Sequence, residues 1–372
     1  FIIFRFKMFI NILLPYKEKF SINKASSISL TVANNLGFSK YKKQIRIFGH
    51  KVEDPMYKNN FIGIQNSWNF LKSKNQNLGH KMCKFINKEN EKFQIIEIHN
   101  RPYLVDSIYL NLKNKKRLSL FLHNDPLEMK GSKTIEDRKN LLSKLDKIYC
   151  VSNYIKKRFL VGIKEDMDKV VILHNGVLRT KKIMPKKFKQ IIYVGRIVKE
   201  KGVDLFVDAI KEIHEDFKDW NFKIIGSPKL GINKLDNFSI KIKEDFESLG
   251  KRAKMIGFIN SKKLNKIMSN ASVIVIPSVW NEPFGLVAAE AMSNGVAVIS
   301  SNSGGLPEII RDNGILINNI NSKKIARQLK KIISDTSLLK ELQKKSWKNF
   351  SFDAKKISSK LDDHRQELFL KN

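Results

Sequence analysis

The stretch ASVIVIPSVWNEPFGLVAAEAMSNGVAVISS, residues 271–301, contains the pattern of a strand, a loop, a helix and a second strand. The runs 271–278 and 296–301 are almost continuously apolar, as parallel strands buried on both faces are. The small and apolar residues 284–294 between them predict a packed helix. A strand, a helix and a second strand in this order favour a parallel sheet of the α/β class.

The same alternation extends along most of the 372 residues, which are enough for two domains. The expected strands form two series, one in each half of the chain. They are 10–15, 44–49, 93–98, 117–123, 147–152 and 169–174, then 191–195, 221–226, 253–258, 271–278, 296–301 and 314–318. The expected helices are 134–145, 153–163, 202–217, 240–249, 261–269, 284–294 and 321–347.

The predicted fold class is therefore α/β, with two Rossmann-like domains facing each other across a cleft. A basic segment of low apolar content, 178–190, separates the two series and is interpreted as the linker. We predict domains at 1–180 and 181–350, and a C-terminal helix within 351–372 that packs back toward the first domain. In such sheets ligands bind beyond the carboxyl ends of the strands.

The chain is strongly basic, with 70 Lys and Arg against 36 Asp and Glu and a formal net charge of +34. Such a charge indicates anionic partners, but a compositional bias toward lysine explains it equally well. Because the lysines are scattered rather than gathered in a stripe, no nucleic-acid partner is expected. A basic helix at NYIKKRF, 153–159, either docks on an anionic membrane surface or is simply solvated.

Cys83 and Cys150 fit no metal-ligand spacing and are expected to be free, buried thiols in a reducing compartment. No run approaches the roughly 18 apolar residues of a membrane span, and the opening FIIFRFKMFINILLPY is not a signal peptide. A cytoplasmic location is therefore expected. Met8 opens a clean first strand, so residues 1–7 are interpreted as upstream sequence.

Glu290 lies within the apolar helix 284–294, and Glu282 stands at its entrance. Ionised carboxylates are rarely buried without partners. Glu290 either binds a ligand diol or forms a buried salt bridge to Arg196 or a lysine. Glu282 either accepts hydrogen bonds from ligand hydroxyls or complements the helix dipole.

Three loops after expected strands have the residues of an anion site. In GRIVKEKG, 195–202, a strand ends at Gly195 and Arg196 and Lys201 precede a helix N-terminus, a combination suited to a diphosphate. The backbone of Phe284, Gly285 and Leu286 offers N–H groups at a second helix start. Gly304 and Gly305 in SSNSGGLPEII, 300–310, form a tight loop, which alone would be an ordinary turn.

Taken together, GRIVKEKG, EPFGLVAAEAM and SGGLPEII closely resemble the C-terminal donor domain of the GT-B glycosyltransferases of family 4. The resemblance implies a retaining hexosyltransferase that takes a hexose or N-acetylhexosamine from a nucleotide sugar, with UDP-sugars favoured. It implies no further cofactor and no metal. The N-terminal domain would bind the acceptor and the C-terminal domain the donor.

The resemblance also assigns roles in the donor domain. Arg196 and Lys201 would neutralise the donor diphosphate, Glu290 would bind the ribose, and Glu282 would contact hydroxyls of the donor sugar. The backbone at Phe284, Gly285 and Leu286 would hold phosphate and sugar, and the glycines at 195, 304 and 305 would line the donor site. The segment 224–237 departs from the family pattern, because it has one glycine and a longer insert after the second strand.

In the first domain the resemblance extends to histidines that follow strands. His123, in FLHNDPLEMKG, resembles a histidine that reaches the donor sugar, and His99 and His174 are weaker candidates. Lys17, Lys19, Ser21 and Ala25 stand where the family has a glycine-rich loop. The segments around 13–30 and 122–131 are similar to the subgroup that acts on lipopolysaccharide-core or related envelope acceptors, which implies a glycan or lipid-linked acceptor. A soluble acceptor, or a non-catalytic basic protein on a degenerate fold, are the alternatives.

Overall fold

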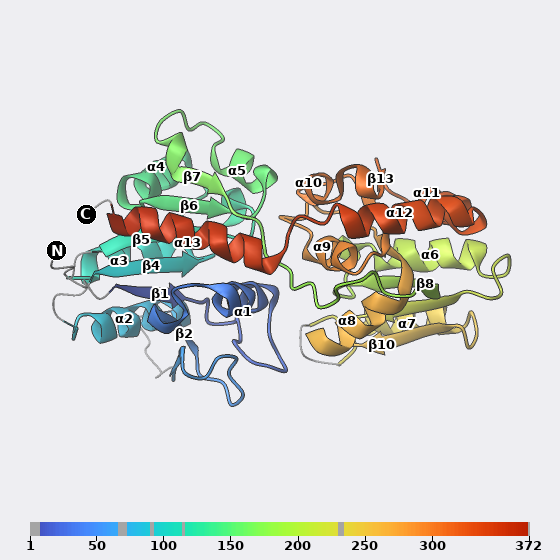
Figure 1. Ribbon diagram of the computed structural model, residues 1–372, viewed down its shortest axis with the longest axis horizontal. Coiled ribbons are helices and arrows are strands. Elements are labelled where there is room, and N and C mark those ends of the chain that lie inside the picture. The colour runs from blue at the N-terminus through green and yellow to red at the C-terminus, as the bar shows by residue number, and fades with distance from the viewer. Residues whose placement is uncertain (1–7, 66–72, 90–92, 114–115, 230–233, 371–372) are drawn as a thin grey trace. The chain divides into compact units, whose positions relative to one another are not determined.

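The computed structural model describes residues 8–65, 73–89, 93–113, 116–229 and 234–370 (Figure 1). The chain forms two compact units, Phe1–Gly176 with Ala354–Asn372, and Val177–Asp353. The first unit therefore ends four residues before the predicted boundary at 180. The C-terminal helix belongs to the first unit.

In the N-terminal unit, the described residues form a seven-stranded parallel sheet in the order β3-β2-β1-β4-β5-β6-β7. Its strands are β1 (Phe9–Leu13), β2 (Ile45–His50), β3 (Phe61–Ile64), β4 (Gln94–His99), β5 (Lys116–Leu122), β6 (Lys147–Cys150) and β7 (Val170–Ile172). Its helices are α1 (Ser27–Phe38), α2 (Lys74–Ile86), α3 (Val105–Asn111), α4 (Ile135–Lys144), α5 (Asn153–Phe159) and α13 (Ala354–Leu370).

In the C-terminal unit, the described residues form a six-stranded parallel sheet in the order β10-β9-β8-β11-β12-β13. Its strands are β8 (Phe188–Val194), β9 (Asn221–Ile225), β10 (Ala253–Gly257), β11 (Ala271–Ile276), β12 (Ala297–Ser301) and β13 (Ile315–Ile317). Its helices are α6 (Val203–Ile213), α7 (Asn237–Glu247), α8 (Ser261–Asn270), α9 (Leu286–Ser293), α10 (Leu306–Ile310), α11 (Ser322–Ser334) and α12 (Thr336–Lys348). The predicted α/β class with two Rossmann-like sheets is confirmed.

The observed elements depart from the expected ones at several places. The sequence did not predict β3, since this edge strand has four residues of which only Ile64 is buried. The helix predicted over 321–347 is two helices, because Asp335 is extended and its side chain caps Leu338 N at the start of α12. Strand β8 begins at Phe188, inside the segment interpreted as the linker.

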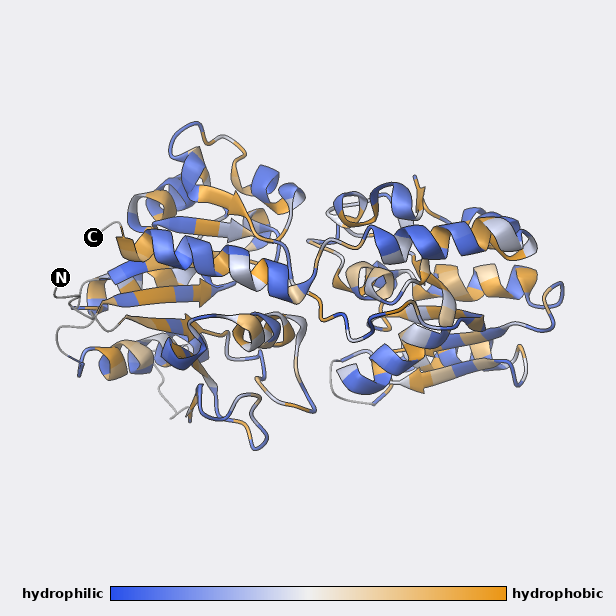
Figure 2. Cartoon of the chain, in the orientation of Figure 1, coloured by the Kyte–Doolittle hydropathy of each residue, from blue (hydrophilic) through white to orange (hydrophobic). Residues whose placement is uncertain are grey.

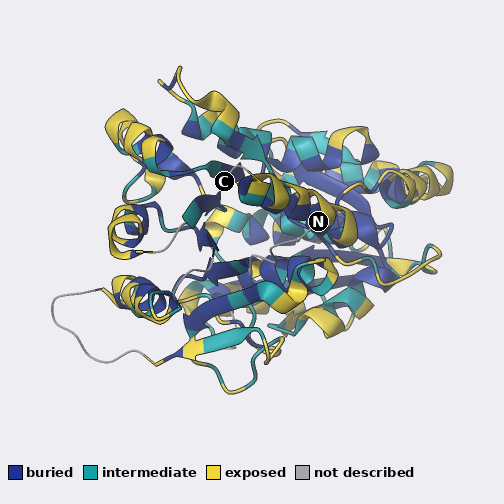
Figure 3. Ribbon diagram, turned by 60° about the vertical axis from the view of Figure 1, so that its left-hand side comes forward, coloured by how far each residue is buried: buried dark blue, intermediate teal, exposed yellow. Residues whose placement is uncertain are grey.

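Apolar strands form the interior of each unit, and helices cover both faces of each sheet. In Figure 2, β1 and β4 are largely orange, and Figure 3 shows buried strands beneath helices whose outer faces are exposed. In the C-terminal unit, Phe206 of α6 and Leu329 of α11 join strand residues such as Ile191 in one apolar cluster. Among the described residues, no helix has the length and apolar character needed to cross a bilayer.

In each sheet the strand order reverses its direction of growth at one point. The reversal lies between β1 and β4 in the N-terminal unit and between β8 and β11 in the C-terminal unit. The loops that follow the two strands of each pair diverge to opposite sides and leave a crevice at the carboxyl edge of the sheet. Each unit therefore has its own place for a ligand.

Helix α13 is held in the N-terminal unit by a buried ionic network. Arg365 Nε and Nη2 donate to the two oxygens of Glu97, on β4, at 2.7 and 2.8 Å. Arg365 Nη1 donates to Asp362 Oδ1 at 2.9 Å, and the same oxygen accepts from Ser39 Oγ at 2.8 Å. Burial opposes the charge on Arg365, but Glu97 and Asp362 outweigh it and raise the pKa of the guanidinium.

Replacing Arg365 by methionine should destabilise the N-terminal unit by about 3–5 kcal/mol, because it leaves the Glu97 carboxylate buried without its partner. Lys40→Met, which removes the exposed pair between Lys40 and Asp363, should cost less than about 1 kcal/mol. Urea unfolding followed by far-ultraviolet circular dichroism measures both. Equal costs for the two variants would contradict a stabilising role of the network.

Candidate functional site

The loops after β8 and β11 meet at the strand-order reversal of the C-terminal unit. Val279 N donates to Glu200 O at 3.0 Å across the two loops. Gly202 has a φ of 67°, and a Cβ at this position would overlap Pro277 O. Glycine is therefore required at 202, where the chain turns into α6.

Lys201 and Glu282 form an ion pair between these loops. Lys201 Nζ donates to Glu282 Oε1 at 2.5 Å, and Ser278 Oγ donates to the same oxygen at 2.6 Å. The Lys201 ammonium also lies 4.8 Å from the centre of the Trp280 ring. The sequence treated Lys201 and Glu282 as separate ligand-binding groups and did not single out Ser278 or Trp280.

This pairing changes the electrostatics expected of the loop. Lys201 and Glu282 largely neutralise each other, so the pair presents less positive charge than two free cations would. Lys201 retains further N–H donors, and Glu282 Oε2 has no hydrogen bond within the described part of the chain. The pair can therefore still hydrogen-bond a ligand while each group fixes the other.

Arg196 is a free cation of the loop after β8. Its side chain is exposed and makes no ion pair with any residue that the structure describes. Its backbone is fixed, because the buried Tyr193 hydroxyl donates to Arg196 O at 2.8 Å. Burial and then the charge of Glu282 raise the pKa of Tyr193, which keeps the hydroxyl protonated as the donor. Arg196 therefore combines a hydrogen-bonded backbone with an exposed, charged side chain, which is suited to an anionic ligand.

Glu290, on α9, has no internal partner. Its side chain is partly exposed, and no hydrogen bond or ion pair joins its carboxyl group to another described residue. The alternative of a salt bridge to Arg196 or a lysine is therefore wrong for this structure. Desolvation raises the pKa of Glu290 to about 7. That this carboxyl group binds a ligand diol stays a prediction, with which its lack of a partner among the described residues is compatible.

The helix that carries Glu290 begins later than predicted. Gly285, with a φ of 99°, precedes its first residue, Leu286. Phe284 therefore lies in the loop, where its ring is buried and packs edge-on against Phe352 at 5.7 Å. The N-terminal amides of α9 belong to Leu286 and the residues after it, and Phe284 contributes an apolar anchor.

Gly304 and Gly305 connect the loop after β12 to Glu282. Gly305 N donates to Glu282 O at 2.7 Å. A Cβ on Gly304, which has a φ of 59°, would overlap the backbone of Glu282. At Gly195 two backbone segments also approach closely. Gly226 packs against the carbonyl group of Gly195, and Gly195 N donates to Ile225 O at 3.1 Å. These three glycines have structural tasks in the loops that surround the site.

In the N-terminal unit, His99 is the last residue of β4 and His123 directly follows β5. His99 Nδ1 and His123 Nε2 are 3.0 Å apart, so that one ring donates a hydrogen bond to the other. Burial lowers the pKa of His123 to about 4, and burial followed by the proximity of His123 lowers that of His99. Both rings are therefore neutral near pH 7. His174 follows β7 and does not join them.

No group of three or more candidate metal ligands occurs among the described residues. The thiols of Cys83 and Cys150 are buried, and burial raises both pKa values, that of Cys83 to about 12. Both cysteines are thus unreactive core residues.

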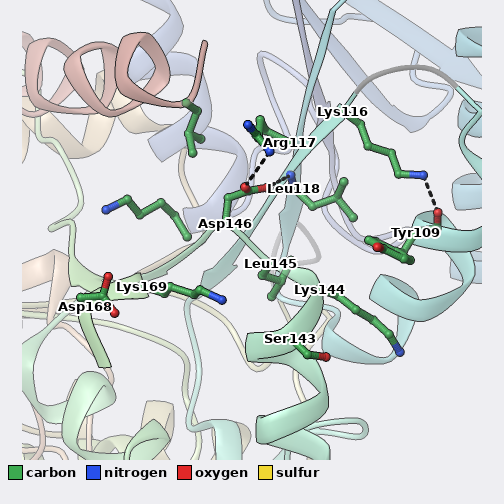
Figure 4. Close-up of a pocket in the computed structure, with 12 residues that line it drawn as sticks. Tyr109, Lys116, Arg117, Leu118, Ser143, Lys144, Leu145, Asp146, Asp168 and Lys169 are labelled. Carbon is green, nitrogen blue, oxygen red and sulfur yellow. Dashed lines mark hydrogen bonds and ion pairs between the residues drawn. The ribbon is translucent and has the colours of Figure 1, made fainter. Parts of the chain in front are cut away.

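A cavity of about 400 Å³ lies at the opposite edge of the N-terminal sheet, at the amino ends of β5 and β6 (Figure 4). Most of its cations are engaged in internal bonds. Lys116 Nζ donates to Tyr109 O at 2.6 Å, Lys169 Nζ donates to Leu142 O at 2.8 Å, and Arg117 pairs with Asp146 at 3.5 Å. These lysines cap helix ends rather than await a ligand.

The sequence of the chain is similar to the sequences of a family of enzymes. Residues 176–349 match the family model described as glycosyl transferases group 1. An uncharacterised glycosyltransferase of Methanocaldococcus jannaschii is 33% identical over 269 residues, which are 68% of this chain and 71% of that protein. The spore coat protein SA of Bacillus subtilis is 26% identical over 285 residues, 69% and 74% of the two chains. The chain belongs to the group 1 glycosyltransferases.

Solved structures show the same fold. Anabaena HepE in complex with UDP-glucose matches with a TM-score of 0.75 and 15% identity over 96% of this chain and 99% of that one. The sucrose-phosphate synthase of Thermosynechococcus elongatus matches with a TM-score of 0.78 and 18% identity over 98% and 100%. The fold is that of the GT-B glycosyltransferases, and the protein is an enzyme of the hexosyltransferase class. The alternative of a non-catalytic protein is not supported.

Gly304→Ala should destabilise the C-terminal unit by about 2–4 kcal/mol, since it combines a left-handed backbone with overlap on Glu282. Gly250→Ala is the matched control, because Gly250 has a φ of 91° but open space around the added methyl group. It should cost only about 1 kcal/mol. Urea unfolding followed by tryptophan fluorescence compares the two, and equal losses would show that overlap contributes nothing.

Glu290→Gln should make the C-terminal unit more stable relative to wild type as the pH rises. The pKa of Glu290 is about 7 in the folded state and near 4.5 when unfolded, so its stabilising contribution is complete below pH 4.5. It is lost as the pH rises through 7, by up to about 3 kcal/mol. Unfolding free energies of both proteins at pH 4.5, 6 and 7.5 test this. A difference that does not vary with pH would contradict the raised pKa.

Proposed function

We propose that this enzyme transfers a hexose or N-acetylhexosamine, with retention of configuration, from a UDP-sugar to a hydroxyl group of a glycan or lipid-linked acceptor. The observation that carries the proposal is Glu290, a desolvated carboxyl group with no hydrogen-bond or ion-pair partner among the described residues. It lies on the helix that follows the loop in which Glu282 binds Lys201. A ribose diol would satisfy it by two hydrogen bonds. HepE, which shares the fold, was solved with UDP-glucose bound, which supports the choice of donor.

The reaction breaks the bond between the sugar anomeric carbon and the β-phosphate oxygen and forms a bond from that carbon to the acceptor oxygen. Negative charge develops on the leaving diphosphate. Arg196, the remaining N–H groups of Lys201 and the first amides of α9 stabilise this charge. The acceptor proton passes to the leaving phosphate on the same face. We propose that these cations take the place of a metal ion.

The Lys201–Glu282 pair has a specific part in this scheme. Ser278 and Lys201 both donate to Glu282 Oε1, which leaves Oε2 to accept from a hydroxyl of the donor sugar. The family resemblance implies that His123, which is paired with His99, reaches the donor sugar. Gly195, Gly304 and Gly305 support the loops from within.

We further propose that the enzyme works in the cytoplasm, in lipopolysaccharide or other envelope biosynthesis, as a member of retaining family 4. Contact of the basic helix α5 with an anionic membrane would bring it to a lipid-linked acceptor. A soluble acceptor is the second candidate, and the likeness to a sucrose-phosphate synthase is compatible with it. Activity that depends on anionic vesicles supports the first, and activity without them supports the second.

Calorimetric titration with UDP, GDP and ADP, without added metal, should show binding of UDP. Arg196→Ala and Glu290→Gln should each weaken it about 10- to 100-fold, because each removes a charged hydrogen-bonding group worth about 1.5–3 kcal/mol. Lys199→Ala removes an exposed cation of the same loop and should leave the affinity within about twofold. Absence of binding to every nucleotide by the folded protein would overturn the proposed donor site.

A further inference from the structure

A pocket of about 540 Å³ opens at the carboxyl edge of β1 and β2 in the N-terminal unit. We call it the β1–β2 pocket, and its defining residues are Lys19, Ser21, Lys24, His50, Lys51 and Asp54. Its volume lies within the range of small-molecule sites. Since ligands of α/β sheets bind at this edge, the pocket has both the size and the position of a substrate site.

The walls of the pocket are built by hydrogen bonds between two loops. Ser21 Oγ donates to Asp54 Oδ1 at 2.6 Å, and the backbone N–H of Asn23 donates to Asp54 Oδ2 at 3.1 Å. Ile22 N donates to Asp54 O at 2.9 Å, and Met56 N donates to Phe20 O at 3.1 Å. Ser21 is 1% exposed. The loop after β1 is thus fastened to the loop after β2 before any ligand binds.

The cations of the pocket are available to a ligand. Lys19, Lys24 and Lys51 are exposed, and none forms an ion pair within the described ranges of the chain. Asp54 is already occupied by neutral donors, which lower its pKa, with the Ser21 hydroxyl as the largest contributor. The remaining acid, Glu53, is exposed. Positive charge therefore exceeds negative charge in the pocket.

His50 lies in this positive field. Its ring contacts Tyr16 at 4.5 Å between centres, and Lys74 lies 4.9 Å from the Tyr16 ring. Desolvation lowers the pKa of His50, and the charges of Lys19 and Lys74 lower it further, against a hydrogen bond to the backbone of Ile64. Its Nδ1 is buried and has no partner among the described residues. The ring therefore senses the charge in the pocket, whether or not it contacts a ligand directly.

The lysines of the cavity at β5 and β6 differ from those of the β1–β2 pocket in their hydrogen bonds. There, Lys116 and Lys169 are bound to backbone carbonyls at helix ends and cannot turn to a ligand without uncapping those helices. In the β1–β2 pocket, the side chains of Lys19, Lys24 and Lys51 form no ion pair within the described chain. Their unpartnered ammonium groups surround a preformed cavity at the ligand-binding edge.

We infer that the β1–β2 pocket binds the acceptor, and that the acceptor is a sugar carrying a phosphate group. This inference rests on the proposed function, since it names the chemistry of the acceptor for the same reaction. The lysines would neutralise the phosphate, and the Glu53 carboxylate would contact sugar hydroxyls. A neutral sugar would lack the main attractive interaction and would bind weakly.

The test uses the full chain saturated with UDP, so that the donor site is filled, and titrates it with glucose 6-phosphate, glucose and inorganic phosphate. Glucose 6-phosphate should bind at least about tenfold more tightly than glucose. Lys19→Ala combined with Lys51→Ala should weaken it about tenfold, a loss of about 1.4 kcal/mol. The matched control, Lys218→Ala with Lys340→Ala, removes two exposed lysines of the C-terminal unit and should leave it unchanged.

A second measurement locates the bound group. Nuclear magnetic resonance titration of the histidine rings should show that glucose 6-phosphate raises the pKa of His50, because the anion offsets the charges of Lys19, Lys24, Lys51 and Lys74 more than Glu53 and Asp54 already do. His80, His214 and His364, to which no role in the reaction is assigned, are internal controls. The pKa of His50 should not respond to glucose.

Four outcomes would overturn the inference. Glucose 6-phosphate could bind no more tightly than glucose, or equally well to the double lysine variant. Inorganic phosphate could bind as tightly as glucose 6-phosphate, which would make the pocket an anion site without sugar recognition. The variant could lose binding to phosphatidylglycerol vesicles while it keeps glucose 6-phosphate, which would make the lysines a membrane contact. Failure to bind UDP, measured separately, would count against the proposed donor site alone.

Discussion

The backbone and side chain of Glu282 hold together three loops of the C-terminal unit. Its carbonyl oxygen accepts from Gly305, its backbone excludes any side chain at Gly304, and its carboxylate holds Lys201 of the loop after β8. These contacts are short and join the three loops at the carboxyl edge of the sheet. Charged groups that are held in place in this way can stabilise a developing anion without reorganising.

The two glutamates of this segment show how environment separates identical groups. Glu282 is paired, with Lys201 and Ser278 both donating to one oxygen. Glu290, eight residues later, has no partner, and desolvation raises its pKa to about 7. The fold therefore uses the carboxylate of Glu282 to join its own loops, whereas that of Glu290 bonds to no other described residue. The unsatisfied group is a cost in the free protein that ligand binding can relieve.

Much of the fold could be predicted from hydrophobic runs, because a strand buried on both faces needs a continuous apolar segment such as 271–276. Strand β3 was missed since an edge strand needs no such run. The break between α11 and α12 was missed because it depends on one extended residue, Asp335, within an otherwise uniform amphipathic pattern. The β1–β2 pocket was also not predicted, since Ser21 and Asp54 are joined by tertiary contacts alone.

By itself the sequence determined the class of this protein: the alternating strands, the three motifs of the second domain, and the residues Arg196, Lys201, Glu282 and Glu290. These follow from the chain because periodicity and motif spacing are local properties. The tertiary structure decided which charges are free and which are paired. In the folded protein, Lys201 binds Glu282, and His99 contacts His123. The side chains of Arg196 and Glu290 form no ion pair with any residue that the structure describes. Pairing and desolvation depend on groups that approach from distant parts of the chain, and sequence spacing does not encode those distances.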